Sequence, residues 1–183
     1  MVKQLLERVA LGLESRAVPY MIIGGQAVLV YGEPRLTQGV DVTLGVGPEQ
    51  LAKIQDLASA SGWEVLADRP PDFVQRTLVL PCLDPQSGIR LDFIFSFSDY
   101  ESQAIEHALQ VQVGQALVRF ASPEDLVIHK MVAGRPRDLE DIRGILLKNP
   151  GIDLPYIERW LRDFDRSLGR GMIAEFQSLR RSA

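Results

Sequence analysis

The sequence predicts an α/β fold of the α+β kind, with a mixed-sheet core, flanking helices and a C-terminal helical extension. Short apolar segments that read as strands are interleaved with helical segments over residues 1–121, whereas only helical patterns follow from Ser122 onward. Strands followed by a run of helices are typical of this fold class. The length of 183 residues, with 46% hydrophobic and 24% charged residues, suits one globular domain with an extension. We therefore expect a core over residues 1–121 and a helical region over 122–183.

The first 60 residues predict alternating helices and strands. Leu5, Val9 and Leu13 repeat at four-residue spacing, so residues 2–16 are expected to form an amphipathic helix. Apolar runs, alternation and Gly or Pro breaks then predict a strand at 20–23, a helix at 26–31, a strand at 40–44 and a helix at 48–60.

The rest of the chain predicts strands first and helices afterwards. Strands are expected at 64–66, 77–80 and 88–96, followed by a hairpin of 111–113 and 116–120. Ser122 begins the helical region, because a Ser cap, a following Pro and Asp125 three residues on resemble a capping box. Breaks in that helical pattern are expected at 134–136 and 150–151.

Composition excludes several classes of protein. Twenty Lys and Arg against 24 Asp and Glu give a net charge of −4, so no global basic field favours nucleic acid. The single Cys82 excludes an internal disulfide framework and a Cys-rich zinc site. No apolar run approaches the roughly 20 residues that cross a bilayer. We therefore expect a cytoplasmic protein without a membrane partner.

Gly24 and Gly25 lie between the first predicted strand and the helix that follows it. Glycines allow backbone N–H groups to approach an anion, and the N-terminus of a helix favours negative charge. The same pair is also the usual composition of a tight turn. Both interpretations stay open at this point.

Two aspartates are expected on the polar faces of predicted strands. Asp41 shares a strand face with positions 39 and 43, because side chains alternate along a strand. Asp92 lies opposite an apolar face, where burial of a carboxylate is costly unless it is paired or binds a metal. An ion pair with Arg90 or Arg119 is the alternative to a metal ligand. Two such carboxylates after a Gly-Gly turn favour a metal site.

A further polar group follows Ser122. Lys130 could supply a positive charge for phosphate, and Asp138 and Asp141 share one helix face because they are three residues apart. They could orient Lys130 or Arg137. Acidic residues in a first helical turn also complement the helix dipole, and this structural role is an equal alternative.

These segments, in this order, resemble the nucleotidyltransferase superfamily with the polymerase-β-type fold, and within it the small prokaryotic branch of AbiEii-like toxin nucleotidyltransferases. The branch has a Gly-Gly turn, an Arg-x-Thr-x-Asp-apolar-Asp motif, a later Asp and a helical Lys with Arg-Asp-x-x-Asp. The matching residues are Gly24, Gly25, Arg35, Thr37, Asp41, Asp92, Lys130, Arg137, Asp138 and Asp141.

The resemblance implies transfer of a nucleoside monophosphate from an NTP to an acceptor such as tRNA or a protein. It also implies a toxin of a toxin–antitoxin or phage-defence system, with a cognate antitoxin as partner. Asp41 and Asp92 would bind Mg²⁺ and act in catalysis with Lys130. The nucleotide would be bound by the two glycines, Arg35, Thr37, Lys130, Arg137, Asp138 and Asp141. A transferase of the aminoglycoside-nucleotidyltransferase sort shares this chemistry and differs in its acceptor.

Gly39 departs from the motif, which has a carboxylate at this position. With one carboxylate fewer, the site should bind Mg²⁺ weakly and catalyse poorly. The chain could be a degenerate member, Gly39 could be a natural or engineered inactivating change, or Asp92 or Glu33 could compensate. The alternative function is therefore a catalytically inactive nucleotide-binding or protein-interaction module.

Overall fold

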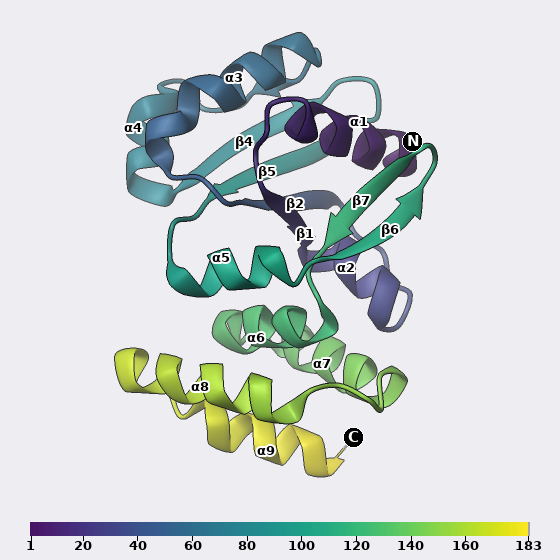
Figure 1. The fold of residues 1–183 in the computed structure, drawn as a ribbon, viewed down its shortest axis with the longest axis vertical. Coiled ribbons are helices and arrows are strands. Elements are labelled where there is room, and N and C mark those ends of the chain that lie inside the picture. The colour runs from purple at the N-terminus through teal and green to yellow at the C-terminus, as the bar shows by residue number, and fades with distance from the viewer. Residues whose placement is uncertain (183) are drawn as a thin grey trace. The chain divides into compact units, whose positions relative to one another are not determined.

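The computed structural model describes residues 1–182, which form a seven-stranded mixed sheet and a set of helices (Figure 1). The helices are α1 (Val2–Glu14), α2 (Gly24–Tyr31), α3 (Leu51–Ala60), α4 (Pro70–Thr77), α5 (Asp99–Glu106), α6 (Pro123–Ala133), α7 (Pro136–Lys148), α8 (Leu154–Leu168) and α9 (Met172–Ser182), with a 3₁₀ turn η1 (Pro48–Gln50). The strands are β1 (Tyr20–Ile23), β2 (Gly39–Leu44), β3 (Glu64–Val65), β4 (Val79–Asp84), β5 (Ile89–Phe95), β6 (Leu109–Val113) and β7 (Ala116–Phe120). The predicted fold class is confirmed.

The chain divides into two compact units, Met1–Gln26 with Thr37–Ala121 and Ala27–Leu36 with the residues from Ser122 onward. The first unit contains the whole sheet. The second contains α6 to α9 and a short segment from the N-terminal half. The division at residues 121 and 122 that the sequence suggests stays a prediction.

The strand order of the sheet is β3-β4-β5-β2-β1-β7-β6. The central strands β2 and β5 run parallel, and β1 pairs with β2 antiparallel and with β7 parallel. Strand β2 is buried on one face by Val40, Val42 and Leu44, as its alternation predicts. The opposite face of β2 and β5 carries the candidate site residues of this unit.

The region between α3 and β5 differs most from the sequence-based expectation. Residues 70–77 form the helix α4, which was not expected, and the strand expected at 77–80 instead runs from Val79 to Asp84. Pro81 lies inside that strand, and its carbonyl accepts a hydrogen bond from the Leu66 backbone N–H. In a strand the N and O of one residue point to the same side. The missing N–H of Pro81 therefore faces Leu66, and the one ladder bond that it cannot make lies just beyond the last residue of the short strand β3.

The second unit begins with the helix start that the sequence predicts. The Ser122 hydroxyl accepts a hydrogen bond from the Asp125 backbone N–H and donates one to the Asp125 carboxylate. Helix α6 ends at Gly134, whose φ of 64° is left-handed. Such a C-cap favours glycine. Apolar side chains of α6, α7, α8 and α9, including Met131, Ile142 and Phe176, are buried in this unit.

Candidate functional site

The parallel pairing of β2 and β5 makes Asp41 and Asp92 direct neighbours. The register pairs Asp41 with Asp92, and Gly39 with Arg90. Residues two apart on a strand share a face, so all four positions lie on the same face of the sheet. Adjacent strands are about 4.8 Å apart. The structure thus brings together two carboxylates that are 51 positions apart in the chain.

Gly24 packs directly against one of these carboxylates. Its φ of 65° is left-handed, and a Cβ atom added there would overlap the Asp41 carboxylate oxygen Oδ2. The next residues, Gly25 and Gln26, form the first turn of α2, where backbone N–H groups lack partners within the helix. The glycine turn therefore places a helix N-terminus next to Asp41.

We expect Gly24→Ala to disturb the site more than its backbone strain alone explains. A left-handed φ costs a non-glycine residue about 1–2 kcal/mol. Gly62 is the matched control, because its φ is 70° and an added Cβ would meet nothing within 4 Å. Urea unfolding should show a larger loss of stability for Gly24→Ala than for Gly62→Ala. Equal losses would mean that the Asp41 carboxylate moves away without cost.

Gly39 begins β2 in a backbone conformation that other residues can adopt. It is not among the glycines with positive φ, and an added Cβ would meet only the Arg90 carbonyl oxygen, at 3.4 Å. Its own carbonyl accepts hydrogen bonds from Gln26 Nε2 at 3.3 Å and from Thr37 Oγ1 at 3.4 Å. The absence of a side chain at position 39 therefore leaves space on the face that carries Asp41.

Gln26 is a contact residue that sequence reasoning missed. It is 5% exposed, and its side chain ties the start of α2 to the start of β2. The position of Gln26 directly after a Gly-Gly turn does not by itself indicate this contact. The contact can be inferred only once β1 and β2 are known to be neighbouring strands.

Asp92 is engaged in the ion pair with Arg90 that was one of the alternatives open from the sequence. Arg90 Nε lies 2.9 Å from Oδ1 and 3.1 Å from Oδ2 of Asp92. The Asp92 side chain is 23% exposed and that of Arg90 is 56% exposed. Solvent can therefore reach this pair.

The donor set on this face fits one divalent cation. Asp41 and Asp92 supply two hard carboxylate ligands side by side, and Mg²⁺ commonly binds through one or two carboxylates together with substrate phosphates. The described residues contain no group of three or more His, Cys, Asp or Glu side chains placed to hold a metal. A pair of cations bridged by a third carboxylate does not fit, since Gly39 occupies that position.

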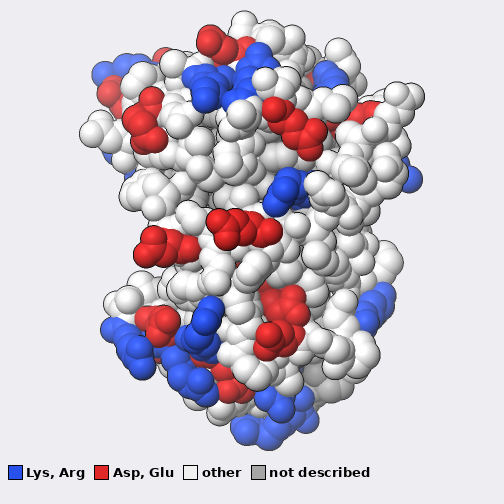
Figure 2. Space-filling view, in the orientation of Figure 1, with Lys and Arg blue, Asp and Glu red and all other residues white. Residues whose placement is uncertain are grey.

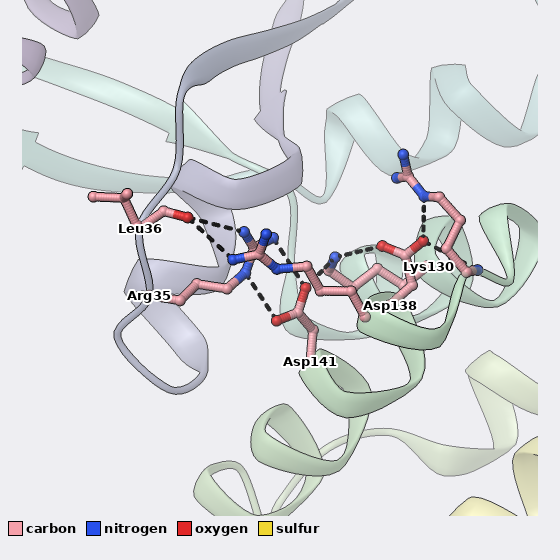
Figure 3. Close-up of polar contacts among 7 residues, drawn as sticks. Arg35, Leu36, Lys130, Asp138 and Asp141 are labelled. Carbon is pink, nitrogen blue, oxygen red and sulfur yellow. Dashed lines mark hydrogen bonds and ion pairs between the residues drawn. The ribbon is translucent and has the colours of Figure 1, made fainter.

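Four of the remaining candidates form a buried charge cluster within the second unit, namely Lys130, Asp138, Asp141 and Arg35 (Figure 3). Lys130 Nζ lies 3.0 Å from Asp138 Oδ1 and 2.6 Å from Asp141 Oδ2. Each of these three side chains is no more than 7% exposed. Both aspartates therefore orient Lys130, one of the two roles considered from their spacing on α7.

Arginines complete the cluster at both carboxylates. Arg35 donates to Asp141 through Nε at 2.9 Å and Nη2 at 3.0 Å, a bidentate pair. Arg135 Nε donates to Asp138 Oδ2 at 2.7 Å. Burial raises the pKa of Asp138, but hydrogen bonds from Arg135 and Lys130 and their charges outweigh it and hold that pKa below its usual value. Each of the two carboxylates in the cluster is thus paired with Lys130 and with one arginine.

The same helix α7 fixes the segment that leads to β2. Arg137 Nη2 donates to the Leu36 carbonyl at 3.3 Å, and Lys148 Nζ donates to the Gly32 carbonyl at 3.0 Å. Asn149, which follows α7, donates to the Tyr31 carbonyl at 2.9 Å. Arg35 and Arg137 therefore both make contacts within this unit, and their predicted roles in nucleotide binding stay predictions.

The face of the molecule seen in Figure 2 carries charges of both signs. Basic and acidic side chains are interspersed over the face seen in Figure 2, in keeping with the net charge of −4. No helix among the described residues is long and apolar enough to span a membrane.

Residues 2–170 match the family described as "Nucleotidyltransferase of unknown function (DUF6036)", and the chain belongs to this family. A search of curated protein sequences found no match. The narrower resemblance to the AbiEii-like branch stays a prediction.

Solved structures with low sequence identity share the fold. The crystal structure of ANT(2")-Ia in complex with adenylyl-2"-tobramycin is 17% identical, with a TM-score of 0.60, and the match covers 99% of this chain and 98% of that one. An antigenic nucleotidyltransferase-like protein from Paracoccidioides brasiliensis is 16% identical (TM-score 0.57; coverage 98% and 91%). The lincosamide antibiotic adenylyltransferase LnuA, bound to lincomycin, is 15% identical (TM-score 0.50; coverage 73% and 89%).

Proposed function

We propose that the chain binds a nucleoside triphosphate on the β2–β5 face and transfers its nucleoside monophosphate to an acceptor. The observation that carries this proposal is the pairing of Asp41 with Asp92 on adjacent parallel strands, beside the Gly24 turn. Membership of a nucleotidyltransferase family supports the reaction type.

In this reaction an acceptor oxygen attacks the α-phosphorus, and the bond to the oxygen that bridges to the β-phosphate breaks, releasing pyrophosphate. The acceptor proton passes to a carboxylate of the Asp41–Asp92 pair. The N–H groups at the start of α2 would contact phosphate oxygens, which suits a helix N-terminus. A Mg²⁺ ion held by Asp41 and Asp92 would supply neutralisation of the charge that develops on the phosphates.

Two observations suggest different classes of acceptor molecule. The resemblance to AbiEii-like toxins implies tRNA or a protein, a toxin role and a cognate antitoxin. The fold neighbours are described with tobramycin and lincomycin, which supports a small hydroxyl-bearing molecule as the alternative. Incubation with α-labelled NTPs and total RNA, total protein or an aminoglycoside would show which of them becomes labelled.

A catalytically inactive nucleotide-binding module is the second candidate. The absence of a carboxylate at Gly39 and the engagement of Asp92 by Arg90 favour it. Metal-dependent NTP binding together with pyrophosphate release would support the transferase. Binding without release in the presence of all acceptors would support the module.

We expect Asp41→Asn to weaken Mg²⁺-dependent nucleotide binding at least tenfold, because an amide is a poorer ligand for a hard cation than a carboxylate. The substitution is nearly isosteric, so the free energy of unfolding should change by less than about 1 kcal/mol. Asp68→Asn is the control, since Asp68 is exposed and lies outside the site. Calorimetric titration with each NTP and thermal unfolding check both expectations. A large fall in melting temperature with unchanged binding would give Asp41 a structural role instead.

A further inference from the structure

Arg90 lies on the face of β2 and β5 that carries Asp41 and Asp92. It is close both to Gly39, where the carboxylate is missing, and to Asp92, with which it forms an ion pair. It is the register partner of Gly39, and it shares its strand face with Asp92. The strand that lacks a carboxylate at position 39 is therefore paired with a strand that carries a guanidinium at the neighbouring position. On this face, one cation of the protein itself stands beside Asp41 and Asp92.

The guanidinium of Arg90 is only partly used inside the molecule. Its Nε contacts both Asp92 oxygens, which leaves Nη1 and Nη2 without a hydrogen bond to the described part of the chain. The side chain is 56% exposed. An added Cβ at Gly39 would meet nothing but the Arg90 carbonyl within 4 Å, so there is open space over position 39. The donors of Arg90 are thus accessible on the site face.

The chemistry of these donors matches phosphate. An arginine fork donates parallel N–H groups to two oxygens of a phosphate, and its charge is permanent at all relevant pH values. By binding Asp92 through Nε, Arg90 also neutralises one of the two carboxylates that would otherwise repel a nucleotide. Both effects reduce the need for a bound cation.

We propose that Arg90 binds nucleotide phosphates directly and takes over part of the role of the divalent cation, so that the chain binds NTP without metal. This inference rests on the proposed function, since it needs the nucleotide to lie on the β2–β5 face. It assigns to Arg90 a role in substrate binding. It also explains how the face can lack a carboxylate at position 39 and still bind a polyphosphate.

The test measures binding of ATP, GTP, CTP and UTP by titration calorimetry, in excess EDTA and in excess Mg²⁺. We expect the affinity in EDTA to lie within about tenfold of the affinity in Mg²⁺. Arg90→Gln should weaken binding in EDTA at least tenfold and should increase the dependence on Mg²⁺, because Asp92 is released to bind the cation. Arg90→Lys, which keeps the charge without the fork, should fall between these values.

Arg76→Gln is the matched control, since Arg76 is an exposed arginine of the first unit whose Nε contacts only a backbone carbonyl. Thermal unfolding should show all three variants folded, because exposed side chains contribute little to stability. Nucleotide binding that requires Mg²⁺ and is unchanged in Arg90→Gln would overturn this inference and leave the proposed function standing. A lack of NTP binding with and without Mg²⁺ would overturn the proposed function itself.

Discussion

Gly39→Asp is expected to raise Mg²⁺-dependent pyrophosphate release by two orders of magnitude or more over the present sequence. The substitution adds a carboxylate on the same strand face as Asp41, where it could bridge two cations. An aspartate can adopt the backbone conformation of Gly39, because its φ is not positive. There is also room for the side chain, since an added Cβ would be in ordinary van der Waals contact with the Arg90 carbonyl oxygen alone. Continuous detection of pyrophosphate with NTP, Mg²⁺ and cellular RNA or protein checks this expectation, and growth inhibition on expression would accompany it for a toxin.

The neighbouring guanidinium modifies this expectation. A carboxylate at position 39 would lie beside its register partner Arg90, and an ion pair between them would compete with the metal. The double variant Gly39→Asp with Arg90→Gln should therefore exceed the single variant in pyrophosphate release. Such an interaction between two neighbouring positions is measured as the non-additive part of a double-mutant cycle.

Gly39→Asn controls for size without charge and should leave pyrophosphate release at its present value. If both aspartate variants fold, bind Mg²⁺ and NTP, and still release no pyrophosphate with RNA, protein and aminoglycoside present, the binding module replaces the transferase as the function. The gain of activity therefore separates the two functions that the sequence alone leaves open.

Much of the site face follows from local rules of the sequence. Alternation alone places Asp41 and Asp92 on the polar faces of their strands, because Val40, Val42, Leu91 and Phe93 must be buried. Alternation does not say which strands are neighbours. The pairing of β2 with β5, from which the Gly39–Arg90 relation follows, depends on sheet topology and on residues between the two strands. The sequence alone therefore indicates Arg90 only as a partner of Asp92.

The elements that were missed also have a physical explanation. Helix α4 has a proline pair at its start and only one buried residue, Val74, so its apolar periodicity is too weak to read. The Pro at position 81 argues against a strand, and only the early end of β3 makes it acceptable there. In the second unit, the three-residue spacing of Asp138 and Asp141 predicts a shared face. Lys130 on α6 forms ion pairs with both aspartates only because α6 packs against α7, which the spacing does not predict.

Lys130→Met is expected to destabilise the protein by about 3 kcal/mol, the lower end of the cost of removing one partner from a buried ion pair, because each aspartate keeps an arginine. Lys130 is the central cation of its cluster, and its loss leaves Asp138 and Asp141 buried with only the peripheral Arg135 and Arg35. Lys53→Met is the control, since Lys53 is exposed on α3, and it should change the free energy of unfolding by less than about 0.5 kcal/mol. Urea denaturation at pH 7 measures both.

The pH dependence gives this prediction a second readout. The pKa of Asp138 is lower in the folded protein than its ordinary value, so its contribution to stability is present above that ordinary value of about 4 and is lost as the pH falls through the folded pKa. Removal of Lys130 takes away one hydrogen bond and one charge that lower this pKa, so the folded pKa moves toward the ordinary value. The acid-dependent loss of stability that Asp138 causes should therefore be smaller in Lys130→Met and should end at higher pH. Adding Asp141→Asn to Lys130→Met should recover part of the stability, because one buried carboxylate then needs no cation. A Lys130→Met variant as stable as the parent, with weakened NTP binding, would instead make phosphate binding the main role of Lys130.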